Sequence, residues 1–256
     1  MTLALVALAA VLGLAVGSFL NVVIHRVPRK ESVVSPRSRC PGCGTELASR
    51  DNIPVLSWLL LRGRCRTCSM AISPRYPLVE LSTGVLYGLL ALRLHDDAAL
   101  PAFLVLGAAQ IAISLIDLEH FIVPNRIVYP TLFLMAPLLV GAAVVEDDWL
   151  SLRGSVLGGL LAFGILFVIH VVSPRGMGFG DVRLAGVLGA ALGWLDLGHV
   201  LLGLFLGFLT ASVISLSLIG LKVRSRKDRI PFGPFLALGA LLAVFAGEPI
   251  LRWYGV

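Results

Sequence analysis

Charged residues are scarce in this chain. Of its 256 residues, 14% are charged and 57% are hydrophobic, whereas a soluble domain has about 25% charged and roughly 45–50% apolar residues. This imbalance excludes an ordinary water-soluble fold and indicates a protein whose solvent is lipid. Because a membrane-spanning helix needs about 20 apolar residues, the length leaves room for roughly seven to nine spans.

The sequence also lacks the short motifs of several enzyme classes. It contains no His-Glu-x-x-His, no Gly-Lys-Ser/Thr phosphate loop and no Gly-x-Ser-x-Gly elbow, which removes the common zinc protease, P-loop and serine hydrolase chemistries. The glycines at 176, 178 and 180 do not form a dinucleotide fingerprint, because Arg183 stands where the third glycine is required. Any catalysis must therefore depend on other residues.

Long apolar runs bounded by charge, Pro or Gly predict the membrane helices. Eight such runs occur, at residues 2–24, 78–94, 100–117, 127–145, 154–172, 182–197, 199–221 and 231–247. The first connection is long, polar and rich in Arg, and the others are short. We therefore expect an all-α membrane protein of about eight transmembrane helices, with a first helix at 1–24, a small cytosolic domain at 25–77 and a seven-helix membrane domain at 78–256.

The placement of Lys and Arg predicts the orientation of these helices. With the N-terminus outside, 18 of the 21 Lys and Arg lie on the cytosolic side, and Arg93, Arg153 and Arg252 lie outside. No basic residue precedes the first apolar run, so we expect an anchor rather than a cleaved signal peptide. The net charge of +6 then reflects membrane sidedness, and we expect a lipid bilayer as partner and no nucleic acid.

All four cysteines lie in the 25–77 connection, as two Cys-x-x-Cys pairs. Four thiolates in two such turns suit the tetrahedral coordination of Zn²⁺. Two disulfides are the alternative, but structural disulfides are rare on a cytosolic face. We therefore expect a structural zinc that leaves no open position for water, bound by Cys40, Cys43, Cys65 and Cys68.

Two aspartates stand at the ends of apolar runs rather than in solvated loops. Asp117 ends the third run and Asp181 begins the sixth, so the expected topology brings both to the cytosolic face. An ionisable group at the edge of the hydrocarbon is costly and indicates function. Each also has a plain structural explanation, since Asp181 could cap a helix and Asp117 could mark the water boundary or pair with Arg126.

Two neighbouring carboxylates share a proton, so that one acts as a general base on water and the other as an acid to a scissile carbonyl. We expect the two carboxylates to lie within about 3–7 Å of each other, the range of known carboxylate pairs. Gly178 and Gly180 have no side chains, so a substrate strand or another helix could approach the backbone before Asp181.

The motifs together resemble those of the bacterial prepilin peptidases, the type IV leader peptidase family. The likeness covers nearly the whole chain and rests on the paired Cys motifs and on Gly-Ser-Phe-Leu-Asn-Val-Val-Ile-His-Arg-Val-Pro at 17–28, Asp-Asn-Ile-Pro-Val-Leu-Ser-Trp at 51–58, Arg-Tyr-Pro-Leu-Val-Glu at 75–80, Ile-Asp-Leu-Glu-His at 116–120 and Gly-Phe-Gly-Asp at 178–181. Glu119 and Asn125 stand where relatives often have Asp, and Arg183 stands where Lys is common.

The resemblance implies a function. It implies that Asp117 and Asp181 form the catalytic pair of an aspartyl peptidase of the inner membrane, with its site facing the cytosol. The implied substrates are helices of prepilins or pseudopilins, which lose a short basic leader. It also implies zinc at the four cysteines and N-methylation with S-adenosylmethionine as donor, for which no residue here is assigned.

Two other classes of protein remain as alternatives. A non-catalytic zinc-knuckle scaffold of a pilus or secretion system would use both aspartates structurally. A transporter would more naturally place its charges near the midplane of the membrane. The sequence does not define the oligomeric state.

Overall fold

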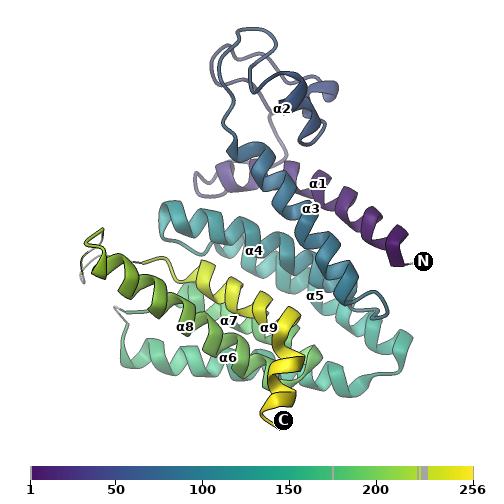
Figure 1. Cartoon of the computed structure of the whole chain (residues 1–256), viewed down its shortest axis with the longest axis vertical. Helices are drawn as coiled ribbons and strands as arrows, with labels where there is room; N and C mark the ends of the chain where they lie inside the picture. Colours follow the sequence, from purple (N-terminus) through teal and green to yellow (C-terminus); the bar gives the residue numbers. More distant parts are fainter. Residues whose placement is uncertain (1, 175, 224, 226–229, 256) are drawn as a thin grey trace. The chain divides into compact units, whose positions relative to one another are not determined.

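The computed structural model describes residues 2–174, 176–223, 225 and 230–255. The regular elements of these residues are helices, and they contain no β-strand. Figure 1 shows the order of the elements along the chain. They are α1 (Thr2–Arg26), the short 3-10 helix η1 (Ser49–Asn52), α2 (Leu56–Leu60), α3 (Arg75–Arg93), α4 (Leu100–His120), α5 (Asn125–Glu146), α6 (Trp149–Val172), α7 (Phe179–Leu195), α8 (Leu197–Gly220) and α9 (Gly233–Trp253).

The long helices confirm the all-α fold class, and each of the eight apolar runs lies on one of them. Within the described residues, six are long and apolar enough to cross a membrane, namely α1, α4, α5, α6, α8 and α9. Helix α7 has only 17 residues. Helix α3 begins at Arg75 and includes Pro77, which is tolerated because the N–H groups of the first helical turn have no partner within the helix.

The chain divides into two compact units, Met1–Asp96 and Asp97–Val256, which we call the N-terminal and C-terminal units. The sequence-based division at residues 24 and 77 separates the expected cytosolic segment from the membrane helices, and it stays a prediction. Some of the basic residues that support this sidedness lie outside the described residues, namely Arg175, Arg224, Arg226, Lys227 and Arg229.

In the N-terminal unit, α1 packs against α3 through small residues. A Cβ atom added at Gly13 would lie 2.6 Å from the backbone oxygen of Thr83, and one added at Gly17 would lie 2.6 Å from Cα of Glu80. Glycine at these two positions allows the two backbones to approach closely, as small residues do in membrane helix pairs.

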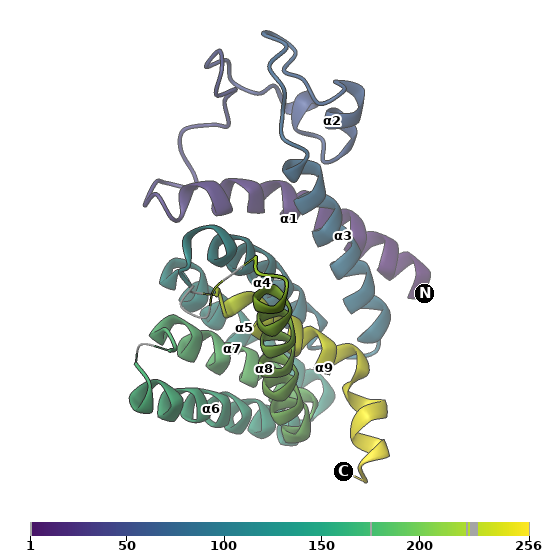
Figure 2. The same ribbon diagram turned by 60° about the vertical axis from the view of Figure 1, so that its left-hand side comes forward.

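In the C-terminal unit, α6 and α7 run side by side (Figures 1 and 2). Their contact is formed by two pairs of glycines with four-residue spacing. A Cβ atom at Gly193 would lie 2.2 Å from the oxygen of Gly154, and one at Gly158 would lie 2.5 Å from the oxygen of Gly189. Helices α8 and α9 make a similar contact at Gly203 and Gly239. The backbones of this unit are therefore held close together around α7.

Candidate active site and metal centre

Asp117 lies in the last turn of α4 and is 4% exposed. Its Oδ2 accepts a hydrogen bond of 2.9 Å from the N–H of Gly233, the first residue of α9. The N-terminus of a helix favours a carboxylate because its first N–H groups are unpaired and carry a partial positive charge. A Cβ atom at position 233 would lie 2.9 Å from this carboxylate oxygen, so the contact depends on glycine.

Asp181 lies in the first turn of α7 and is 9% exposed. The N-cap of α7 is Gly178, without a side-chain cap, so Asp181 is not the capping residue that the structural alternative assumed. Its Oδ1 is buried and has no hydrogen-bond partner within the described residues. A Cβ atom at Gly178 would lie 3.2 Å from Oδ2 of Asp181. One carboxylate oxygen of this buried aspartate is therefore unused by the fold.

The two aspartates are brought to the same end of the C-terminal unit by Val123, in the connection between α4 and α5. A Cβ atom at Gly180 would lie 2.9 Å from Cβ of Val123, and one at Gly233 would lie 3.4 Å from its Cγ2. The start of α7 and the start of α9 thus both contact Val123, while Gly233 contacts Asp117. The charge of Asp117 is within electrostatic range of Asp181.

Contacts from α5 and α6 hold the segment that leads into Asp181. The Nδ1 atom of His170 lies 2.8 Å from the backbone oxygen of Met177. Because a carbonyl oxygen only accepts, Nδ1 carries the hydrogen and donates it. The ring of His170 packs at 5.4 Å from that of Phe179. Arg183 lies 4.7 Å over the ring of Phe179 and donates to Oδ1 of Asn125. Residues before and after Asp181 are therefore held in place by contacts with α5 and α6.

Sequence reasoning found both aspartates but missed Val123, His170 and Gly233. A Gly-Pro pair before an apolar run is a helix-start signal, and Gly233 and Pro234 display it. No local signal indicates that this helix start meets Asp117. The use of Gly178 and Gly180 by a substrate stays a prediction, although Gly180 already packs against Val123.

The four cysteines form a second site, in the N-terminal unit. They are free, and their sulfur atoms all lie within 4.8 Å of one another, with 3.7 Å between Cys40 Sγ and Cys68 Sγ. Four sulfurs at about 2.3 Å from a tetrahedral Zn²⁺ are separated by about 3.8 Å. The cluster therefore has the composition and spacing of a structural metal site, as the Cys-x-x-Cys pairs predict.

The two halves of this site are structural repeats. The N–H of Cys40 donates to Thr45 O and its carbonyl accepts from Gly44 N, while the N–H of Cys65 donates to Met70 O and its carbonyl accepts from Ser69 N. Each turn closes with a single antiparallel bridge, between Arg39 and Glu46 and between Arg64 and Ala71. We call these two turns the first and second knuckle.

The thiols have divergent acidities without a metal. The hydrogen bond with the Thr45 side chain lowers the pKa of Cys43 to about 6. Despite an opposing backbone hydrogen bond at Met70, loss of hydration and the neighbouring thiols raise the pKa of Cys68 to about 11. Four adjacent thiols cannot all ionise unless a cation balances them, so the donor set fits a divalent metal.

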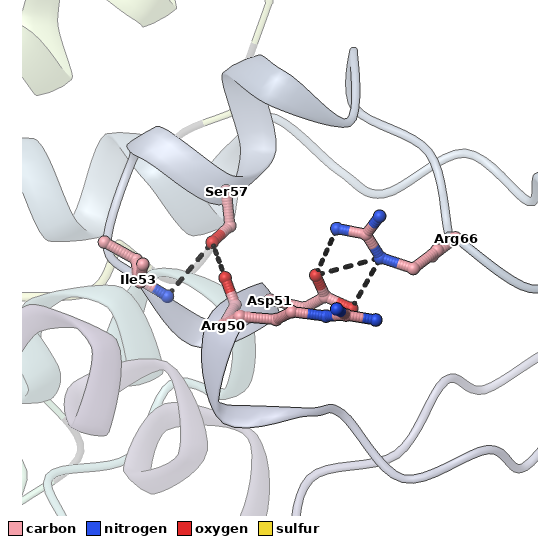
Figure 3. Close-up of polar contacts among 5 residues, drawn as sticks. All are labelled: Arg50, Asp51, Ile53, Ser57 and Arg66. Carbon is pink, nitrogen blue, oxygen red and sulfur yellow. Dashed lines mark hydrogen bonds and ion pairs between the residues drawn. The ribbon is translucent and has the colours of Figure 1, made fainter.

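An ion pair supports the second knuckle from η1. Arg66 donates through Nε and Nη2 to Asp51, with a shortest distance of 2.6 Å (Figure 3). The hydrogen bond from Arg66 holds the pKa of Asp51 below its ordinary value. Arg66 lies between two of the cysteines in the sequence, so this pair ties the metal site to the segment before α2.

Long apolar helices, two buried carboxylates at neighbouring helix ends and a four-thiol cluster define the class: a membrane protein with a candidate carboxylate-pair site. The comparisons give the family. Residues 11–94 match the bacterial peptidase A24 N-terminal domain, and residues 104–220 match the type IV leader peptidase family. The chain belongs to the type IV leader peptidase family. Together with its six apolar helices, this indicates a multi-pass protein of the inner membrane.

Curated relatives share most of the chain. A prepilin leader peptidase/N-methyltransferase of Aeromonas salmonicida is 36% identical over 94% of this chain and 90% of its own length. The protein of that name in Pseudomonas aeruginosa is 35% identical over 98% of this chain and 94% of its own. The protein of that name in Myxococcus xanthus is 44% identical over 75% of this chain and 57% of its own length. No solved structure matches the chain.

Proposed function

We propose that this chain is an aspartyl endopeptidase that removes the short basic leader from type IV prepilins or pseudopilins, with Asp117 and Asp181 as its catalytic pair. The observation that carries the proposal is the pair of buried carboxylates at the neighbouring ends of α4 and α7. Membership of the family and the names of the relatives point to the same reaction.

The environments of the two carboxylates suggest a division of labour. The N–H of Gly233 at the start of α9 favours a negative charge on Asp117. One oxygen of Asp181 has no hydrogen-bond partner among the residues that the structure describes, and Asp181 can hold the shared proton. In this scheme Asp117 takes a proton from water as it attacks the scissile carbonyl, and Asp181 protonates the carbonyl oxygen. Proton return to the leaving amine then breaks the C–N bond without a covalent intermediate.

The orientation also forms part of the proposal. With the N-terminus outside, α4 ends and α7 and α9 begin on the cytosolic side. The contacts among Asp117, Val123, Gly180 and Gly233 join those three helix ends, as this alternation requires. Such a site would face the cytosol, where the leader of a substrate helix begins.

The four cysteines are proposed to bind a structural zinc. The metal would be held by four thiolates, with Cys40 and Cys65 buried and Cys43 and Cys68 exposed. It would supply folding energy to a segment that is too short to form a large core of its own. N-methylation of the new N-terminus with S-adenosylmethionine as donor is proposed from the names of the relatives alone, and we assign no residue to it.

The deciding experiment is cleavage of a purified prepilin by the purified full chain in lipid. Asp117→Ala and Asp181→Ala are each expected to abolish cleavage. Glu119→Gln is the matched control, because this carboxylate lies on the same helix end with a side chain 45% exposed, and it should cleave normally. Normal processing by either Asp variant would overturn the catalytic pair and favour the scaffold alternative. A labelled methyl donor in the same reaction tests the second activity.

A further inference from the structure

The short helix α2 turns its apolar side chains outward. Ile53, Leu56, Leu59 and Leu60 are 47%, 49%, 58% and 73% exposed. Leu56, Leu59 and Leu60 have the i, i+3 and i+4 spacing of one helical face, and Ile53 lies just before the helix. We call these four residues the α2 apolar face. A water-facing helix has the opposite arrangement, with its apolar residues against the protein.

Polar contacts on the inner side fix this orientation. Ser57 is 7% exposed, and its Oγ accepts from the N–H of Ile53 and donates to the backbone oxygen of Arg50, at 3.0 and 2.9 Å (Figure 3). Trp58 donates through Nε1 to the oxygen of Ile72 in the second knuckle. Because these polar groups are satisfied inside, α2 cannot rotate its leucines inward without breaking three hydrogen bonds.

A contact with α3 places α2 beside the membrane helices. The N–H of Val55, immediately before α2, donates to Oε2 of Glu80 at 2.7 Å. Glu80 lies in the second turn of α3, against Gly17 of α1. Gly17 lies within the apolar run of α1, seven residues before Ile24 at its end. The start of α2 is therefore tied to a residue that packs inside the apolar part of α1.

The charges near α2 complement an anionic lipid surface. Arg62 and Arg64 are exposed and follow α2 directly. No acidic residue occurs between Asp51 and Glu80, and these two are occupied by Arg66 and by the Val55 N–H. Leucines beside basic residues are the composition of helices that lie in the headgroup region of anionic membranes.

We propose that the α2 apolar face inserts into the headgroup and acyl boundary of the bilayer that α1 crosses, with Arg62 and Arg64 on anionic lipid headgroups. Five residues are too few for membrane binding by an isolated helix. Here the chain enters the segment from α1 and leaves it through α3, and this covalent attachment supplies a high effective concentration of lipid surface. The knuckles are thereby held against the membrane, independently of the proposed peptidase activity.

Photocrosslinking of the full chain in nanodiscs tests this proposal. Benzoylphenylalanine replaces Leu60, and in a matched control it replaces Leu47, an exposed leucine of the first knuckle. In equal parts phosphatidylcholine and phosphatidylglycerol, the Leu60 site should yield several-fold more phospholipid adduct than the Leu47 site by intact mass. Phosphatidylglycerol should predominate in the adduct, and Arg62→Glu with Arg64→Glu should remove this preference.

Two results would overturn the proposal. One is a lipid adduct at position 60 no more abundant than at position 47. The other is an adduct to a second copy of the chain or to an added prepilin in place of lipid. Protected amides at Cys40 and Cys65 in hydrogen exchange show that the labelled chain is folded, and a misfolded Leu60 variant is replaced by the same label at Leu59.

Discussion

The thiol cluster and the carboxylate site are held in place in different ways. The cysteines lie on two turns whose hydrogen bonds are local, each within about ten residues of sequence. The carboxylates lie at the ends of membrane helices, and Asp117 reaches its partner Gly233 across 116 positions of sequence. The knuckles therefore depend on turn geometry and metal, whereas the carboxylate site depends on the packing of α4, α7 and α9.

The largest effect should come from removing charge at the carboxylate site. Asp117→Asn and Asp181→Asn keep the volume of each side chain but cannot exchange the shared proton, and each should lower the cleavage rate by about 10²–10⁴-fold. The double variant should be scarcely slower than either single variant, because the two groups act as a unit. Steady-state cleavage of a prepilin measures this. Multiplicative losses in the double variant would instead indicate independent roles.

Metal removal should affect the two knuckles and leave the carboxylate site unchanged. Chelation, or Cys65→Ser, should expose the backbone amides of both knuckles to hydrogen exchange, because the four ligands hold the two turns together. The amides around Asp117 in α4 should keep their protection. Hydrogen exchange by mass spectrometry reports both regions in one sample. Equal loss of protection in α4 would show that the carboxylate site depends on the metal.

A methyl group at the start of α9 should disturb Asp117 more than its other neighbour, Val123. Gly233→Ala puts a Cβ atom 2.9 Å from Oδ2 of Asp117, which forces the carboxylate or α9 to move, and a lost charge-assisted hydrogen bond of about 1.5–3 kcal/mol corresponds to roughly 10–100-fold in rate. The control is Gly164→Ala on α6, where an added Cβ atom meets nothing within 4 Å. Unchanged cleavage by Gly233→Ala would contradict the role of this contact.

A smaller effect is expected at His170, which contacts the turn rather than the carboxylates. Asn can present its side-chain N–H where Nδ1 of His170 stands, whereas Phe keeps the ring but donates nothing. His170→Phe should slow cleavage about fivefold, the equivalent of one lost hydrogen bond of about 1 kcal/mol, and His170→Asn should recover most of the rate. If both variants are equally slow, ring packing on Phe179 is the important contact.

The sequence predicts the helices, the thiol cluster and the two aspartates, but not the contacts of Gly233 and His170. Apolar runs locate the helices because lipid requires long apolar segments, and paired Cys motifs locate the thiol cluster because its ligands are close in sequence. Charge in an apolar run identifies Asp117 and Asp181. Gly233 and His170 escape detection because their partners are distant in sequence or are backbone atoms, and neither leaves a local pattern.

At one matched position of the two knuckles the backbone is left-handed in both, and the residue is glycine in one knuckle and serine in the other. This gives the last prediction, which concerns stability and leaves the carboxylate site untouched. Gly44 and Ser69 occupy the same place in the two turns, with φ of +71° and +58°. A left-handed conformation costs a residue with a side chain about 1–2 kcal/mol, and glycine avoids this cost. Gly44→Ser should therefore lower the midpoint of metal-dependent unfolding, and Ser69→Gly should raise it slightly. A chelator titration of the two variants compares them directly, and an increase in both midpoints would show that backbone strain does not limit either knuckle.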